Sequence, residues 1–437
     1  MAICQLLRRV GFSYLLLFSL TSFATEDQSE IIEDLEYELE DLIKQIEEKN
    51  NSFKINGFLS AGLAYSDSHV PIESIDLDND YNFAPEAVLG LQLEFNLDEK
   101  SKVVTQLIGR GKFDFDIIAE WAYFAYKLTP ALTLRAGRVR IPLFLLSDYL
   151  EVGYAYPWVR PPSEVYDVAE LFSSQDGMDV LYNFSAKGID TQLQLGGGTL
   201  ARTSPSYGGL EFKARNMITA STKSNYKSWT LNANIAGLEF VADTEGTTLG
   251  NVNDDLEVTG AGEIKFDHLG ITYMSLGVSY DDGTWLLQAE ATQVDYEDRP
   301  GPQIFPFTRS HYVSVARRFG RITPYILYSK NRSVGAAERQ EAMAIYTEAI
   351  LSGTVVSDPL NTLGLLALLD HTQASVALGF SYSLSAKAVM KFEWKRIGKT
   401  KGTVGEFEDF AAYTSILLEQ DALDGTNVYN LVFDIVF

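Results

Sequence analysis

The C-terminal half of the chain repeats one pattern, in which two stretches of alternating apolar and polar residues surround a short turn and a long polar connection follows. The last stretch, 427–437 (NVYNLVFDIVF), ends on the aromatic Phe437. Strands of about ten residues with short turns on one side only are typical of a transmembrane β-barrel, because hydrocarbon tolerates neither an open sheet edge nor an unpaired backbone group. The pattern therefore predicts an all-β, antiparallel transmembrane β-barrel.

Residues 1–24 have the order of a secretory signal peptide. Arg8 and Arg9 precede an apolar run over 10–20, and the small residues Ser22 and Ala24 follow it. This apolar run is too short for a membrane helix, so we expect cleavage before Thr25. The only cysteine, Cys4, lies inside this segment, and the mature chain is expected to have no thiol.

Charge and hydropathy exclude two broad classes of protein. Without residues 1–24, which hold two of the 35 basic and none of the 59 acidic side chains, the net charge changes from −24 to −26. Such an acidic chain is a poor partner for nucleic acid, whose phosphates require clustered Lys and Arg. After the signal peptide no stretch is apolar over the roughly 18 residues that a membrane helix needs, which excludes a helical membrane protein.

Residues 25–50 are predicted to form a short, acidic, periplasmic coiled-coil helix. They contain eleven carboxylates and two lysines, and their apolar residues alternate in spacings of three and four. The predicted seam consists of Ile32, Leu35, Leu39, Leu42 and Ile46. The segment is too short and too charged to be stable alone. Between a helix that lies on its own protein and a coil that self-associates, we favour the coil, because barrels that already trimerise would hold the helices at a high effective concentration.

Residues 53–437 are predicted to form the barrel, with about sixteen strands. The alternation places these strands at 53–65, 86–97, 102–110, 118–128, 132–139, 176–185, 189–199, 227–235, 238–243, 270–280, 284–294, 309–318, 322–330, 372–384, 387–396 and 427–437. An even number puts both chain ends on one side, as in single-chain bacterial barrels. Among the connections, 336–351 has helical spacing, and 243–267 is expected to be an acidic surface loop. A calcium ion among its carboxylates is the alternative, but their spacing is not that of a calcium loop, and we assign no metal or other cofactor.

The connection 140–175 is unusually apolar and aromatic for a loop that meets water. It contains Phe144, Tyr156 and Trp158 together with several prolines. Apolar side chains on a connection need a place to pack, and the interior of a sixteen-stranded barrel provides one. We therefore expect this loop to fold inward, stiffened by its prolines.

Two features of this region resemble a known family. The loop is the third long connection, and the stretch Arg135–Phe144 (RAGRVRIPLF) resembles the Gly-Arg-x-Lys/Arg-x-Pro signature of phosphate-selective and related substrate-specific porins. The predicted N-terminal coil is similar to that of the dicarboxylate-type members. The resemblance implies a trimeric, sixteen-stranded porin in the outer membrane of a Gram-negative bacterium, whose third loop sets the bore. It also implies that Phe437 belongs to the signal read by the barrel-assembly machinery.

Charged residues around the predicted loop suggest a pore constriction. The candidate basic wall consists of Arg110, Lys127, Arg135, Arg138, Arg140, Lys387, Lys391 and Lys395, and the loop contributes Asp148, Glu151, Arg160 and Glu164. A basic wall opposite an acidic loop would place a transverse field over the bore. The alternative for each arginine is a structural ion pair that holds the loop. Strict alternation directs Arg138 toward lipid, unless a bulge turns it inward.

These observations lead us to expect a passive diffusion channel for small hydrophilic solutes in outer-membrane lipid. The net charge favours cations at the mouth, whereas the arginine cluster and the resemblance favour small anions at the constriction. A structural or adhesive barrel that contacts the cell wall or another cell is the alternative. A barrel hydrolase is remote, because the four histidines have no Gly-x-Ser-x-Gly or His-Glu-x-x-His motif around them. We therefore expect no enzymatic activity.

Overall fold

The computed structural model describes residues 52–68, 77, 79–204, 210–242, 248–261, 268–297, 307–334, 336–356, 362, 372–398 and 425–437. The predicted signal peptide and coiled-coil seam lie outside these residues. The chain divides into two compact units, residues 1–54 with 95–99 and residues 55–94 with 100–437. Almost all described residues belong to the second unit, and the following sections concern that unit by itself.

The described residues form sixteen long strands and one two-residue strand. The strands are β1 (Phe53–Ser66), β2 (Tyr81–Asn82), β3 (Val88–Asn96), β4 (Ser101–Arg110), β5 (Ile117–Lys127), β6 (Leu132–Arg140), β7 (Ser174–Ala186), β8 (Ile189–Ser204), β9 (Leu210–Tyr226), β10 (Trp229–Ala242), β11 (Leu269–Asp281), β12 (Trp285–Tyr296), β13 (Phe307–Arg317), β14 (Ile322–Val334), β15 (Gln373–Ser385), β16 (Ala388–Ile397) and β17 (Thr426–Val436). The helices are η1 (Gly111–Phe113), η2 (Ser147–Tyr149), η3 (Gly153–Ala155), α3 (Ser163–Leu171), α4 (Thr248–Thr259) and α5 (Ala336–Leu351).

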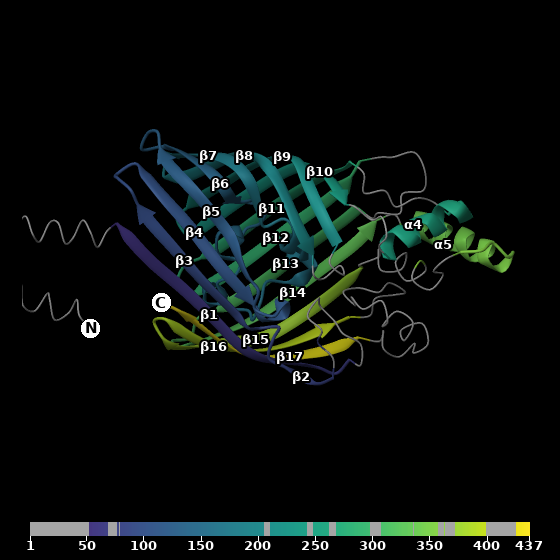
Figure 1. Ribbon diagram of the computed structural model, residues 1–437. Helices are drawn as coiled ribbons and strands as arrows, with labels where there is room; N and C mark the ends of the chain where they lie inside the picture. The colour runs from purple at the N-terminus through teal and green to yellow at the C-terminus, as the bar shows by residue number, and fades with distance from the viewer. Residues whose placement is uncertain are drawn as a thin grey trace, which may run out of the picture. The chain divides into compact units, whose positions relative to one another are not determined.

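The strands close into one antiparallel barrel (Figure 1). Consecutive long strands are neighbours, and the ring closes where β1 pairs with β17, from Phe58 opposite Val436 to Ser66 opposite Val428. Closure pairs the backbone groups of both terminal strands, which is the condition for a sheet to lie in hydrocarbon. The predicted antiparallel barrel of about sixteen strands is therefore confirmed.

Side chains alternate between a polar inner face and an apolar outer face. On β10, Leu231 and Ile235 are 54% and 49% exposed, whereas the intervening Asn232 and Asn234 are buried. On β11, the exposed Leu276 follows the buried Ser275. This is the orientation of a membrane barrel with a polar lumen, because the side-chain period of a strand is two residues.

The predicted strands differ most from the structure at β9 and β10. The stretches 227–235 and 238–243 form a single strand, β10, and the strand β9 was not predicted. Ala236 and Gly237 are not a turn: they lie within β10, where the register against β9 shifts between Gly237 and Glu239. The actual turn is at Lys227, which has a φ of 53°. The two errors cancelled in the strand count.

The described connections contain three α-helices. The predicted helix over 336–351 is α5, whereas the predicted loop 243–267 contains the helix α4. None of the helices within the described residues combines the length and the apolar character needed to span a bilayer. Val252, Leu256 and Ala261, at and just after α4, share a small buried cluster with Tyr346 of α5.

A charged side chain on the outer face tests the orientation of the wall. We expect Leu276→Arg, in the middle of β11, to lower the free energy of unfolding in lipid by about 2–4 kcal/mol, because the guanidinium would face hydrocarbon. Leu351→Arg is the matched control. Leu351 is 82% exposed on α5, outside the barrel strands, and its substitution should change stability by less than about 0.5 kcal/mol. Guanidinium unfolding in vesicles measures both, and equal effects would contradict the assigned orientation.

Candidate pore constriction

The segment between β6 and β7 builds most of the candidate site. Residues 141–173 contain η2, η3 and α3. The prolines stop strand β6 from continuing and set the start of α3, where the Val165 and Tyr166 amides donate to the Pro162 carbonyl over 3.0 Å. We call residues 141–173 the inner segment.

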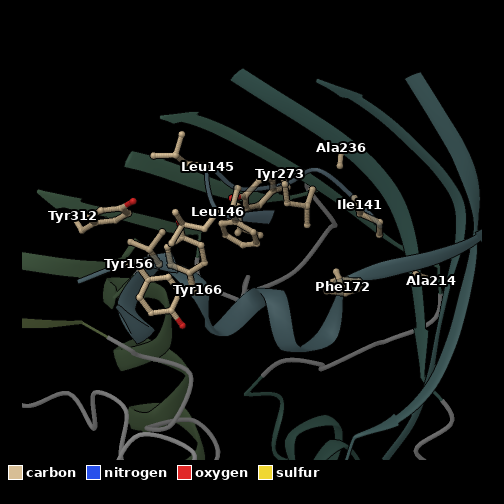
Figure 2. Close-up of a cluster of buried hydrophobic side chains, with 14 of the residues drawn as sticks. Ile141, Leu145, Leu146, Tyr156, Tyr166, Phe172, Ala214, Ala236, Tyr273 and Tyr312 are labelled. Carbon is tan, nitrogen blue, oxygen red and sulfur yellow. The ribbon is translucent and has the colours of Figure 1, made fainter. Parts of the chain in front are cut away.

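The inner segment packs its apolar side chains against the inner face of the barrel. Phe144 stacks on Tyr166 with ring centroids 4.7 Å apart, and Trp158 meets Tyr312 of β13 edge-on at 5.6 Å. Leu146 and Trp158 have no exposed surface. Figure 2 shows this continuous cluster, in which Leu145 and Tyr166 of the segment lie near Tyr312 and Tyr273 of the wall. Burial of this many apolar groups fixes the segment to the wall.

Polar groups of the wall satisfy the backbone of the inner segment. The Leu143 carbonyl accepts hydrogen bonds from Ser275 (2.6 Å) and Asn234 (3.0 Å), and the Leu145 amide donates to Glu290 (2.8 Å). Tyr166 also donates to Glu290, over 2.5 Å. Burial raises the pKa of Tyr166 well above its ordinary value, so its hydroxyl remains a donor. The inner face therefore holds several backbone groups of this segment by specific hydrogen bonds.

Lys391 of β16 is an anchor for the inner segment. Its side chain has no exposed surface and lies 2.9 Å from Asp434 of β17. The ammonium donates to the carbonyls of Gly153 (2.6 Å) and Trp158 (2.5 Å) and lies 4.7 Å from the centroid of the Tyr156 ring. A buried charge needs such complete pairing, because desolvation costs several kcal/mol.

Glu164 of α3 forms the second anchor. Its carboxylate accepts a hydrogen bond from Ser329 (2.7 Å) and lies 3.7 Å from the Lys395 ammonium. Burial alone would raise the pKa of Glu164, but Lys395 and the hydroxyls of Ser375 and Ser329 lower it below its ordinary value. The lowered pKa keeps Glu164 ionised, so this anchor persists at neutral pH and weakens only in acid.

On the side of the inner segment that faces away from the apolar cluster there is a cavity of about 600 Å³. The wall of this cavity comes from β1, β3, β4, β5, β6, β8, β9 and β17, and the inner segment closes it on one side. Its charged lining consists of Arg110, Lys112, Arg138, Arg160 and Arg202 on the basic side and Glu86, Asp116, Glu151 and Asp167 on the acidic side. Arginines of three wall strands thus border the same space as two carboxylates of the inner segment.

Arg110 joins the wall to the inner segment. Its guanidinium lies 2.6 Å from Glu151 and 3.2 Å from Glu120, and the same Glu120 lies 3.5 Å from Arg140. Glu120 is fully buried, at a β-bulge where the register of β4 against β5 shifts between Gln106 and Leu107. The bulge adds a residue to β5 and brings this carboxylate between the two arginines.

Arg138 lies on the cavity although strict alternation directs it toward lipid. Gly137, just before it, has a φ of 128°, which only glycine adopts readily. A Cβ at Gly137 would lie 2.4 Å from the Ala122 carbonyl oxygen. Arg138 pairs with Asp176 through two bonds of 2.7 and 2.8 Å and lines the cavity. The backbone conformation at Gly137 therefore turns the Arg138 side chain toward the cavity, a possibility that the sequence did not decide.

The predicted constriction residues fall into three groups. Arg110, Arg138, Glu151 and Arg160 line the cavity. Arg135, Arg140, Glu164, Lys391 and Lys395 lie in ion pairs around it, Arg135 with Asp179 at 2.6 Å. Lys127 and Lys387 are exposed beside short turns, and Asp148 pairs with Lys223 at 2.7 Å. None of these three lines the cavity among the described residues.

Four charged residues of the cavity that lie outside the connection 140–175 were not predicted. Lys112 and Asp116 belong to the link around η1, between the predicted strands 102–110 and 118–128, and Arg202 lies beyond the predicted end of β8. Glu86, which lies 3.3 Å from Arg160, was assigned to a strand. Alternation did not mark the longer β8, because Leu200 and Arg202, two residues apart, share a face although one is apolar and the other charged.

Comparisons with known proteins support the fold. No family model and no curated protein matches the sequence. The structure is similar to the anion-selective porin from Comamonas acidovorans, with a TM-score of 0.52 and 12% identity over 88% of this chain and 99% of that one. It is also similar to OmpF of Salmonella typhi, with a TM-score of 0.51 and 10% identity over 88% and 97% of the two chains. A third similar structure is the loop L8 deletion mutant of OmpT, an outer membrane protein of Vibrio cholerae, with a TM-score of 0.51 and 12% identity over 88% and 99%.

At these identities the likeness shows the fold alone. The chain is a transmembrane β-barrel with the sixteen-stranded architecture of outer-membrane porins, and its apolar outer face contacts lipid.

Removal of the Lys391 charge tests the anchor of the inner segment. We expect Lys391→Met to lower the free energy of unfolding by about 3–5 kcal/mol, because Asp434 would remain as a buried, uncompensated charge. Lys391→Met combined with Asp434→Asn should regain a large part of this loss, since both charges are then absent. Unfolding in detergent measures this cycle, and additive losses in the double variant would contradict the proposed coupling.

Proposed function

We propose that the protein is an outer-membrane channel through which small hydrophilic solutes diffuse passively. The observation that supports this most directly is the position of the inner segment. It packs on the inner faces of β8 to β15 and leaves a charged cavity lined by β1, β3 to β6, β8, β9 and β17. A barrel whose only task was structural would have no need of a polar, charge-lined space in its interior.

The proposed selection is physical and involves no bond chemistry. Arg110, Arg138 and Arg202 border the cavity from the wall, while Glu151 and Asp167 border it from the inner segment. Opposed charges across a narrow, low-dielectric space produce a transverse field, which orders water and sorts solutes by charge and dipole. Solute size, hydration and this field then decide what passes.

We further propose a preference for small anions. The cavity is lined by five basic and four acidic side chains, although the whole chain has 35 basic and 59 acidic ones. This local excess of positive charge opposes the global charge, and selectivity is set where the bore is narrowest. The acidic surface favours cations at the mouth. The measurement must therefore determine whether anions or cations pass preferentially.

The reversal potential under a salt gradient tests both parts of the proposal. We expect the reconstituted wild type to conduct and to favour chloride over potassium. Lys112→Gln with Arg202→Gln should lower the anion-to-cation permeability ratio several-fold, because two of the five positive charges are removed from the lining. A protein that inserts but does not conduct would contradict the channel. A cation preference in the wild type would contradict the anion preference alone.

Arg318→Gln is the matched control for this measurement. Arg318 pairs with Asp281 at 2.6 Å beside the short turn between β13 and β14 and does not line the cavity. Its substitution removes a positive charge from a rim of the barrel, so the permeability ratio should stay unchanged.

We also propose that the channel is a homotrimer, which rests on the family resemblance and on the predicted N-terminal coil. The native mass of the detergent-solubilised protein tests this, and a monomeric mass would contradict it.

A further inference from the structure

The outer face of the barrel has a cluster of basic residues where β13 and β14 approach the long connections. Arg309 lies directly opposite Arg332, and His311 lies directly opposite Lys330. Residues adjacent to them in the two strands, Ser310, Tyr312, Ser329 and Ser333, are buried on the inner face. Alternation therefore places the four basic side chains on the outer face. We call Arg309, His311, Lys330 and Arg332 the outer basic cluster.

This arrangement is unfavourable for the protein by itself. Residues directly opposite in an antiparallel pair have Cβ atoms about 4.5–5.5 Å apart, and like charges there repel. Within the described part of the chain, no ion pair includes Arg309, Lys330 or Arg332. The carboxylate nearest in the pairing pattern, Asp295 of β12, accepts hydrogen bonds from Gln293 over 2.7 and 3.0 Å. An anion beside the Arg309–Arg332 pair would compensate these like charges.

The position of the cluster along the barrel axis indicates which part of the membrane it faces. Val313, Ile326 and Tyr328 continue the same outward rows and are 40–48% exposed, as expected for lipid contact. Ile322 begins β14 at the short turn, and Arg332 follows ten residues later. At a rise of about 3.3 Å per residue and a tilt of about 40°, Arg332 lies about 25 Å above Ile322. This equals the height of the apolar band, so the cluster lies at the level of lipid headgroups.

We propose that the outer basic cluster binds the phosphate groups of an outer-leaflet lipid with more than one phosphate. The long connections of such barrels face outward from the cell, so the cluster adjoins the outer leaflet. Two guanidinium groups side by side present parallel N–H donors that suit phosphate oxygens, and Lys330 and His311 add donors one pair below. The acyl chains of the same lipid would lie over Val313, Ile326 and Tyr328. Binding would replace the repulsion across the strand pair with attraction to one ligand.

Thermal unfolding in mixed micelles tests this site on the full chain. Diphosphoryl lipid A is the probe, and the variants are Arg309→Gln with Arg332→Gln and the control Lys213→Gln. Lys213 is an exposed basic residue near the long-connection end of β9, and its cross-strand partners are Ala201 and Val241. A lipid that binds only the folded barrel raises the unfolding midpoint.

We expect lipid A to raise the midpoint of the wild type and of Lys213→Gln by the same amount, and that of the double variant by less than half as much. Without lipid A, the double variant should unfold at the wild-type temperature or above it, because the like-charge pair is gone. General damage to the barrel would lower the midpoint without lipid A, whereas loss of the ligand site alone would not. Equal shifts in all three proteins would overturn the proposal. An equal shift with inorganic phosphate or with a zwitterionic phospholipid would also overturn it.

Discussion

The structure depends on the pairing of β1 with β17. In hydrocarbon every backbone amide and carbonyl must find a partner inside the protein, and a sheet achieves this only when its first and last strands meet. The register from Phe58 opposite Val436 to Ser66 opposite Val428 closes that ring. Closure creates an outer face in lipid and an inner face enclosing a polar space, and the alternation of side chains follows from this division.

The interior is organised by a second requirement, which is that buried charges be paired. Lys391 with Asp434 and Lys395 with Glu164 lie under the inner segment rather than on the open cavity. Arg110 connects Glu120 of the wall with Glu151 of the segment. Ion pairs on opposite sides thus fix the inner segment at both β16–β17 and β4–β5, and the cavity that remains has a defined charged lining. We propose that this rigidity, rather than motion of the segment, sets the bore.

The sequence predicted most of the wall because strand alternation is a local property. It failed at β9, whose outward residues include Ala220, Thr222 and Ser224 and therefore lack the apolar rows that mark other strands. It also treated Ala236 and Gly237 as a turn, because small residues that accommodate a bulge look the same as turn residues. The candidate site was less predictable. Whether an arginine lines the cavity or lies beneath the segment depends on partners such as Asp434 for Lys391, and no local pattern reports these. Arg138 shows the limit most clearly, because its direction depends on the backbone at Gly137.

The contacts of the inner segment also have a consequence for the order of assembly. Lys391 donates to the carbonyls of Gly153 and Trp158, which are 238 and 233 residues earlier in the chain. The segment is synthesised long before the strands that receive it, so its aromatic side chains stay without their final partners until the last strands arrive. Contacts of such long range form slowly, and the nascent polypeptide therefore needs shielding from aggregation during its passage to the membrane. Filling of the interior must be a late event that follows completion of the wall.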